Sequence, residues 1–339
     1  MLVRKTLLSK WMRPFLPLLL VACADDSFEL LQGQTMGTYY AVQYDATESC
    51  HLSGSELSME LVAINDSMST YQTDSEISRL NRSPAAQWLD VSAELAEVLR
   101  VAAEVWRRSD GAFDVTVGPL VNLWGFGPQS LTVAPSPTAQ VEAAADVGME
   151  NLHIDGLRVM KDIPGLYLDL SALAKGYGVD RIAVMLAERG CLNFMVDIGG
   201  EIRVAGHNEN HQLWRIGIEV PDARQMGTLQ TALRLSDLSI ATSGDYRNFR
   251  LVDGLRVDHV FDPRSGKPAS NAVVSATVLH PSAMWADAYS TTLMVLGVEQ
   301  GLRFAVQQGI PAYMMIRRVS EDKIEARYNP AMQAYLPAP

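Results

Sequence analysis

The chain of 339 residues is poor in the residue types that build the common catalytic and metal-binding motifs. It has only three cysteines and six histidines, and they form no cluster with the spacing of a zinc site. No stretch has the Walker A, G-x-G-x-x-G, G-x-S-x-G or H-E-x-x-H pattern. These absences exclude the usual sequence signatures of P-loop NTPases, dinucleotide-binding βαβ units, α/β-hydrolases and zinc proteases.

Positive charge is also scarce. The chain has 28 Lys and Arg residues against 39 Asp and Glu residues, a formal net charge of −11. Four of the basic residues lie in residues 1–22, which contain no acidic residue, so the remainder is more acidic than the total indicates. Nucleic-acid binding and electrostatic adhesion to anionic lipids both need a basic face. We therefore expect no nucleic-acid partner.

The first 22 residues have the organisation of a secretion signal. Basic residues precede the apolar stretch PFLPLLLVA, which is too short to span a bilayer as a helix. The stretch ends in LVAC, which resembles a lipobox, in which signal peptidase cuts before a cysteine that becomes lipidated. We expect removal of residues 1–22, a lipid on Cys23 and a tether over residues 23–33. The alternative is a secreted protein with an incidental cysteine.

Cys50 and Cys191 are the other two cysteines. They could pair in an oxidising compartment, but two cysteines do not define a disulfide framework, so their pairing stays open.

Hydrophobic periodicity predicts a mixture of helices and strands. Apolar residues at helical spacing follow Ser53 and Ser92, two residues suited to helix N-caps, and recur over residues 283–296. Alternating stretches cover residues 28–44 and 193–206, and Asp155-Gly156 predicts a hairpin. Most predicted strands follow one another through tight turns, with helices inserted. We therefore expect an α+β fold with mixed, mostly antiparallel sheets and no firm domain boundary.

The stretch LYLDLSALAKGYGVDRIA, residues 166–183, combines a strand pattern with a helix pattern. Alternating leucines predict a strand, after which Ser171 could cap a helix that ends near Arg189-Gly190. The small residues at the start of this helix would leave backbone N–H groups open to an anion such as a phosphate. The alternative is an ordinary strand–helix joint whose small residues serve packing.

The stretch SAMWADAYSTTLMVLG, residues 282–297, contains a candidate metal site. Asp287 and Thr291 are four residues apart and share one face of the predicted helix. A carboxylate and a hydroxyl so placed can bind a hard cation such as Mg²⁺. Alternatively the two are solvated, or Thr291 bonds back to the carbonyl of Asp287.

The stretch HVFDPRSGKP, residues 259–268, is predicted to leave a strand and enter a tight turn. His259 at the strand end could act as a general base, because an imidazole titrates near neutrality. Asp262 could orient its ring or serve the turn alone. A purely structural His259 is the alternative.

Eight segments together resemble a known family. In chain order they are TMGT, STYQTDSEISRLN, GAFDVTVGPLVNLWGFG, DLSALAKGYGVDRIA, VDIGGEIRVAG, SIATSGDYRNF, HVFDPRSGKP and ADAYSTT. This order is similar to that of ApbE-type FAD:protein FMN transferases, and the resemblance runs from about Gln34 to the C-terminus. It implies that residues 34–339 form one flavin transferase domain with the α+β fold of that family.

The resemblance also implies a reaction and a location. Members of the family use Mg²⁺ to split FAD, attach FMN through its phosphate to a threonine or serine of a target protein, and release AMP. They are periplasmic and usually lipid-anchored, and their usual targets are flavin-bearing subunits of membrane redox pumps, so we expect one as the partner. We expect anchoring in the inner membrane, although Ala24 stands where an Asp commonly retains such lipoproteins there.

Site residues follow from the motif matches. The positions that match FAD contacts are Met36, Tyr71, Ala112, Phe113, Asp114, Asp169, Lys175 and Phe261. Asp114 and Asp169 would face the polar edges of the adenine, ribose or isoalloxazine. The Mg²⁺ ligands would be the backbone carbonyl of Ala172 and the side chains of Asp287 and Thr291. Ser290 is a further candidate ligand. His259 falls where the family keeps its base.

The chain departs from the family pattern at three of these positions. Some relatives have an acidic residue in place of Ser290 and Glu in place of Lys175, and Phe261 replaces a common aliphatic residue. Two other functions stay open: an FAD-binding lipoprotein without transferase activity, and an FAD pyrophosphatase that yields FMN and AMP.

Overall fold

The computed structural model describes residues 27–128, 134–221, 227–245, 249–252, 255–318 and 323–337. The predicted signal segment, Cys23 and Ala24 lie outside these ranges. Residues 27–33, which we expected to be tether, already belong to the fold as part of strand β1 (Ser27–Thr35). The strand forms because residues 27–35 pair along their whole length with the next strand.

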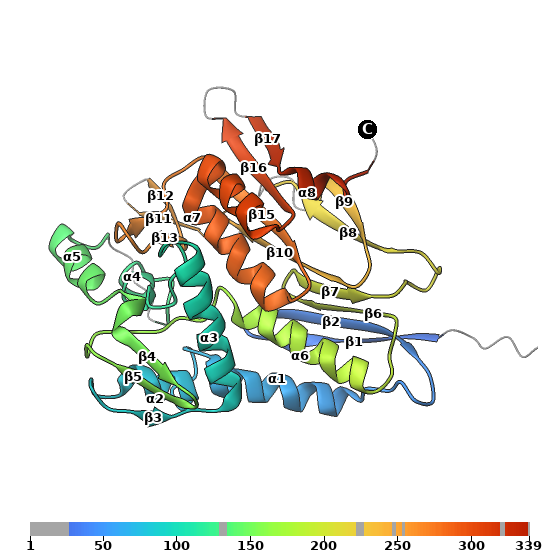
Figure 1. The fold of residues 1–339 in the computed structure, drawn as a ribbon, viewed down its shortest axis with the longest axis horizontal. Coiled ribbons are helices and arrows are strands. Elements are labelled where there is room, and N and C mark those ends of the chain that lie inside the picture. Colours follow the sequence, from blue (N-terminus) through green and yellow to red (C-terminus); the bar gives the residue numbers. More distant parts are fainter. Residues whose placement is uncertain are drawn as a thin grey trace, which may run out of the picture.

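An eight-stranded sheet forms the centre of the molecule (Figure 1). Every neighbouring pair in it is antiparallel, which confirms the predicted α+β class. Its order is β1, β2 (Thr38–Ala46), β6 (Phe194–Ile198), β7 (Glu201–Ala205), β10 (Leu238–Gly244), β15 (Val273–His280), β16 (Ala312–Arg318) and β17 (Lys323–Tyr328).

The two faces of this sheet have different covers, because alternate residues of a strand point to opposite sides. On one face lie the helices α1 (Gly54–Met68), α6 (Ala174–Glu188) and α7 (Ala283–Gln308), as Figure 1 shows. On the other face lie the hairpin of β8 (Trp214–Glu219) and β9 (Leu229–Leu235) and the short helix α8 (Pro330–Gln333). Thus Ala241 packs with the α7 side, whereas Ile240 packs with Trp214 of the hairpin.

A smaller lobe packs beside the helical face. It contains the helices α2 (Glu76–Arg82), α3 (Ala93–Arg108), α4 (Gly118–Leu123) and α5 (Pro137–Ala145), the 3-10 turn η1 (Met149–Asn151), and a sheet of β3 (Leu89–Asp90), β5 (Arg158–Lys161) and β4 (Leu152–Asp155). Two small hairpins, β11 (Phe249–Val252) with β12 (Leu255–Asp258) and β13 (Phe261–Asp262) with β14 (Lys267–Pro268), lie between this lobe and α7.

The predicted helix starts at Ser53 and Ser92 are confirmed. Ser53 and Glu56 form a capping box at α1, and the Ser92 hydroxyl accepts the N–H of Leu95 at α3. The N-cap of α2 is Ser75, whose side chain accepts the Ser78 N–H. Helix α7 does not end at residue 296 as predicted but continues to Gln308. The helix is interrupted at Gly297, which has a positive φ of 71°, and resumes directly after it.

The stretch over residues 166–170 is not the strand that its alternation predicts. Leu166, Leu168 and Leu170 are buried as expected, but only Tyr167 forms an isolated bridge, to Val117. The side-chain amide of Asn81 takes the place of a neighbouring strand: its Nδ2 donates to the Leu168 carbonyl (3.0 Å) and its Oδ1 accepts the Leu168 N–H (2.7 Å).

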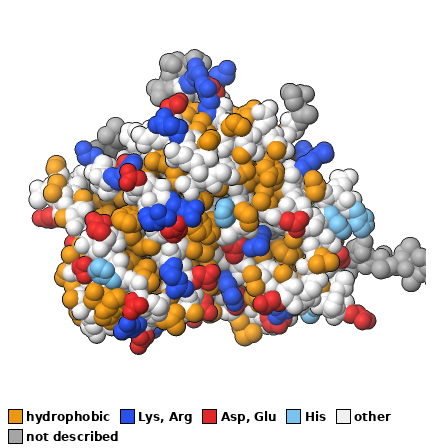
Figure 2. All heavy atoms as spheres, viewed as in Figure 1, with side chains coloured by type: hydrophobic (Ala, Val, Ile, Leu, Met, Phe, Trp, Pro, Cys, Tyr) orange, Lys and Arg blue, Asp and Glu red, His pale blue; other side chains and the backbone are white. Residues whose placement is uncertain are grey.

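Cys50 and Cys191 form a disulfide, which resolves the question that the sequence left open. None of the helices in the described ranges has the length and apolar character needed to cross a membrane. On the face drawn in Figure 2, acidic and basic side chains are intermixed.

Candidate active site

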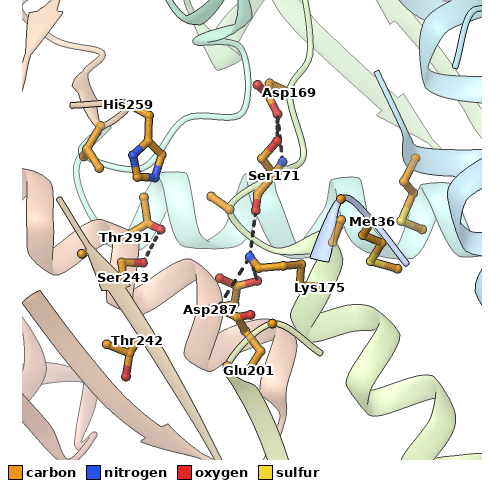
Figure 3. A pocket seen from close by; sticks show the side chains of 18 of the residues that line it. Met36, Asp169, Ser171, Lys175, Glu201, Thr242, Ser243, His259, Asp287 and Thr291 are labelled. Atoms are coloured by element: carbon orange, nitrogen blue, oxygen red, sulfur yellow. Dashed lines mark hydrogen bonds and ion pairs between the residues drawn. The ribbon is translucent and has the colours of Figure 1, made fainter. Parts of the chain in front are cut away.

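One large cavity, of about 1060 Å³, lies where α6, α7 and the central sheet meet the smaller lobe. Its volume is at the upper end of the range for small-molecule sites. The cavity brings together twelve of the residues that the sequence singled out: Met36, Tyr71, Ala112, Phe113, Asp114, Asp169, Ala172, Lys175, His259, Phe261, Asp287 and Thr291. Figure 3 shows Lys175 and Asp287 near its middle, with Met36 toward one side and His259 toward the other.

A lysine between two carboxyl groups forms the ionic centre of the cavity. Lys175 Nζ lies 3.6 Å from Asp287 Oδ2 and 3.5 Å from Glu201 Oε1, and both acidic side chains are nearly inaccessible. Burial alone would lower the pKa of Lys175, but the two carboxylates outweigh it and raise that pKa above its usual value. Lys175 therefore stays charged at neutral pH, while a quarter of its side chain remains exposed to the cavity.

The two carboxyl groups respond to the same environment. Burial raises the pKa of Glu201 to about 8, against the opposing effect of Lys175. Burial also raises the pKa of Asp287, while Lys175 and the Gly176 N–H oppose that rise. Glu201 Oε2 is buried without a hydrogen-bond partner among the described residues. This oxygen is therefore available to a cation or a hydrogen-bond donor that enters the cavity.

The start of α6 offers fewer open N–H groups than we expected. The helix begins at Ala174 and its N-cap is Leu173, so the predicted cap Ser171 lies in the turn before it. The N–H of Ala174 donates to Leu170, and the N–H of Gly176 donates to Asp287 Oδ2 (3.1 Å). Binding of an anion therefore falls to the ammonium group of Lys175 more than to the helix end.

Ser171 is held by Asp169 instead. The Asp169 carboxylate accepts the Ser171 N–H (2.9 Å) and its hydroxyl, which closes an Asx turn before α6. This turn places Ala172, the predicted carbonyl ligand, on the wall of the cavity.

Three hydroxyl side chains adjoin Asp287. Ser243 of β10 lies 3.0 Å from Thr291 and 2.7 Å from Ser290, oxygen to oxygen. Ser290 also donates to the Asp287 carbonyl (2.8 Å) and is fully buried, and it does not line the cavity. The Ser290 hydroxyl is therefore engaged with protein groups here, and its suggested role as a metal ligand stays a prediction.

The oxygen donors present fit a magnesium ion. Carboxylate, hydroxyl and carbonyl oxygens from Asp287, Thr291 and Ala172 border one cavity, and a second carboxylate, Glu201, has an unused oxygen. In the described part of the chain, no three His, Cys, Asp or Glu side chains converge as ligands. Mg²⁺ prefers oxygen, needs few protein carboxylates and completes its shell with water and substrate phosphate.

Aromatic side chains border another part of the cavity. The Tyr71 hydroxyl donates to the Phe126 carbonyl (3.0 Å), and its ring is 66% exposed. The Phe126 ring lies 6.2 Å from Phe261 and 6.3 Å from His259, centroid to centroid. Such rings suit a planar heterocycle.

The carboxylate of Asp114 is largely used inside the protein. Its Oδ1 accepts the N–H and hydroxyl of Thr116, and its Oδ2 accepts the Met149 N–H (3.1 Å). Burial raises the pKa of Asp114, and these hydrogen bonds oppose the rise. Asp114 thus ties the cavity wall to η1 as well as lining it.

His259 follows β12 directly and lines the cavity, as the sequence led us to expect. The Asp262 carboxylate is bound to Arg264, by the Nε (2.9 Å), a terminal nitrogen (2.9 Å) and the backbone N–H (3.0 Å). Of the two roles considered for Asp262, these contacts favour the one in the turn.

Sequence reasoning missed several residues of the site. Glu201, Asp197 and Ser243 line the cavity, as do residues 215–219 of β8. The first three stand within segments that carried the family resemblance, and the acidic residue after Gly199-Gly200 was a visible signal. The residues of β8 had no motif to mark them.

The family model described as "ApbE family" matches residues 36–314, most of the chain. The chain belongs to the ApbE family. Two curated relatives of this ApbE chain are named FAD:protein FMN transferase. One, from Vibrio cholerae, is 44% identical over 88% of this chain and 91% of its own length, and one from Haemophilus influenzae is 38% identical over 92% and 94%.

Solved ApbE structures have the same fold as this chain. The flavin transferase ApbE from Vibrio cholerae superposes with a TM-score of 0.85 and 41% identity, covering 91% of this chain and 99% of the other. The predicted membership and the predicted ApbE-like fold are both confirmed.

Proposed function

We propose that this ApbE chain transfers FMN from FAD to a serine or threonine hydroxyl of another protein and releases AMP. The observation that carries the proposal is that one cavity, large enough for a dinucleotide, holds Lys175, Asp287, Thr291 and His259 together. The names of the curated relatives support it. In this reaction the acceptor oxygen bonds to the FMN phosphorus, the pyrophosphate P–O bond breaks, and AMP takes the electron pair.

Asp287, Thr291 and the Ala172 carbonyl would hold Mg²⁺ in this site. When bound, the ion would offset the charge that builds on the phosphoryl oxygens. Lys175 supplies a fixed positive charge to the same phosphates, because its ammonium group stays protonated and part of it faces the cavity. Fixed charge in a site with little water stabilises a phosphoryl-transfer transition state efficiently.

The aromatic wall gives the flavin a place. Tyr71, Phe126 and Phe261 would contact the planar isoalloxazine, and Met36 would add apolar contact elsewhere in the cavity. His259, next to Phe126, would take the proton from the acceptor hydroxyl as the new bond forms.

The protein would act in the bacterial periplasm, lipid-anchored through Cys23, with inner-membrane anchoring as our expectation. The basic and then apolar leader that ends in LVAC supports the anchor. The buried Cys50–Cys191 disulfide supports an oxidising compartment. The partners would be flavin-bearing subunits of membrane redox pumps. A Cys23→Ser variant should accumulate as uncleaved precursor without lipid label.

One experiment tests the reaction. The protein is incubated with FAD, Mg²⁺ and a flavin-free subunit of a bacterial redox pump, and the products are analysed by mass spectrometry. A covalent FMN on the acceptor, with one AMP per FMN, is the expected result. FMN and AMP without acceptor labelling would instead identify an FAD pyrophosphatase, and unchanged FAD would identify a binding protein.

A further inference from the structure

Strand β8 borders the cavity in an unusual way. All five consecutive residues from Arg215 to Glu219 line it. A strand that presents its face to a cavity contributes every second residue, whereas a strand that presents its edge contributes consecutive ones. Among the described strands, β9 is the single neighbour of β8. The edge of β8 that faces away from β9 therefore forms part of the cavity wall.

The direction of the backbone groups follows from the hairpin. The N–H of Val220 donates to the Thr228 carbonyl (2.8 Å), across to the β9 side. The pairing register shifts between Ile218 and Glu219, but the extra residue there, Gln230, belongs to β9. Peptide groups therefore alternate without interruption between the two edges of β8, and those of Ile218 and Ile216 also turn toward β9. The N–H and C=O groups of Arg215 and Gly217 then turn toward the cavity.

The edge is held firmly in place. Trp214, Ile216 and Ile218 are buried against the central sheet, in one cluster with Val204 and Ile240. Opposite this cluster, β10 pairs with β7 only as far as Ile240, and its next residues, Thr242 to Gly244, line the same cavity. Ser243 in this run contacts Thr291, one of the proposed metal ligands. The β8 edge is thus continuous with the reaction site.

We propose that the acceptor protein binds as an extended segment that pairs with the free edge of β8, through the backbone groups of Arg215 and Gly217. This inference rests on the proposed transferase function, which requires that part of a protein enter the cavity. A strand edge is matched by another extended backbone, since only that shape satisfies its regularly spaced donors and acceptors. Because side chains alternate along such a segment, its register decides which hydroxyl reaches the FMN phosphorus.

A proline substitution tests the pairing. Arg215→Pro removes the N–H that faces the cavity, at an exposed edge position where proline leaves the β8–β9 hydrogen bonds intact. With a flavin-free redox-pump subunit as acceptor, we expect its KM to rise about tenfold or more, the loss expected for one or two hydrogen bonds. The Kd for FAD should not change.

Two matched variants separate the backbone from the side chain. Arg215→Ala removes the same side chain but keeps the N–H, so its acceptor KM should rise clearly less than that of Arg215→Pro. Arg234→Pro places the same substitution on the residue paired with Arg215, where the N–H faces the outer edge of β9. It should leave the acceptor KM unchanged. Circular dichroism and FAD binding check that each variant is folded.

Hydrogen exchange provides a second measurement on the wild type. Adding the acceptor should slow exchange of the Arg215 and Gly217 amides and not of the Arg234 amide. Transfer by Arg215→Pro with an unchanged acceptor KM, or unprotected β8 amides in the complex, would overturn this inference and leave the transferase function standing. No transfer of FMN by the wild type would overturn the function and the inference together.

Discussion

Lys175 links the two acidic side chains of the cavity at the scale of single residues. Its ammonium group lies within 3.6 Å of both Glu201 and Asp287. These two side chains are too deeply buried for water to screen their charges. Without it, two carboxyl groups would face each other in a medium of low dielectric constant, where they could not both ionise without strong repulsion. Lys175 therefore serves the stability of the cavity as well as its proposed role in binding phosphate.

Asp287 is the residue on which metal binding should depend most. Asp287→Ala removes the carboxylate from the proposed metal ligands, so FMN transfer at limiting Mg²⁺ should fall at least about a hundredfold, the effect of losing one of few ligands to a hard cation. Transfer rates across a Mg²⁺ titration measure it. Glu299→Ala, at an exposed position of the same helix, is the control and should behave as wild type. Near-normal transfer by Asp287→Ala would remove Asp287 from the metal site.

His259 should act on the rate and not on FAD binding. His259→Asn removes the proposed base, and a general base typically contributes about 10²–10⁴-fold, so transfer at saturating acceptor should slow by that factor. The wild-type rate should rise with pH near neutrality as the imidazole loses its proton, and the variant should lose this rise. His51→Asn, at an exposed position, serves as control. A variant that keeps the wild-type pH profile would exclude His259 as the base.

At the scale of elements, the site depends on how α6 and α7 cross. A Cβ on Gly176 would lie 2.4 Å from the Ala283 carbonyl oxygen, so only glycine lets the two backbones approach this closely. Asp180 of α6 then caps the other helix: its carboxylate accepts the N–H groups of Ala283 and Met284 (3.0 Å each) and the Ser282 hydroxyl. This contact fixes Asp287 relative to Lys175.

Loss of the Asp180 carboxylate should therefore affect both stability and the metal. Asp180→Ala leaves the first N–H groups of α7 and the guanidinium of Arg203 without this acceptor. We expect the free energy of unfolding to fall by about 2 kcal/mol, the upper range for a lost helix cap, and Mg²⁺ to bind more weakly. Urea unfolding and Mg²⁺ titration measure the two effects. Asp90→Ala, exposed in β3, is the control; equal stability of the two variants would contradict the capping role.

At the scale of the molecule, the disulfide closes a very long loop. It joins the segment between β2 and α1 to the turn between α6 and β6, across 141 residues of sequence. The loop contains α1 to α6 and the whole of the smaller lobe. In the unfolded chain the bond keeps residues 50 and 191 together and so limits conformational freedom.

Reduction of this bond should lower stability substantially. A Cys50→Ser, Cys191→Ser double variant should lose about 2–5 kcal/mol of unfolding free energy, the usual cost of removing a native disulfide. Urea unfolding with and without a reductant measures the loss. The reductant should lower the stability of the wild type to that of the variant and leave the variant unchanged. If the reductant lowered the unfolding free energy of the variant as much as that of the wild type, the loss would have a cause other than this disulfide.

Local features were predictable because neighbours in sequence produce them. The Ser53 and Ser92 caps, the hairpin after Asp155 and the end of α6 near Gly190 depend on a few adjacent residues and were found where expected. The pairing of Asp287 with Thr291 follows from the helical repeat alone. The family resemblance then named many of the residues that line the cavity.

The sequence by itself therefore determined the family, the α+β class, the starts of several helices to within a few residues and many of the residues on the cavity wall. Only the tertiary structure decided which partners those residues have. An alternating stretch at residues 166–170 pairs with the Asn81 amide, 87 positions away, and not with a strand. Glu201 reaches Lys175, Asp180 caps α7, and β8 presents its edge to the cavity. Such contacts depend on long-range packing, which no local pattern of residues specifies.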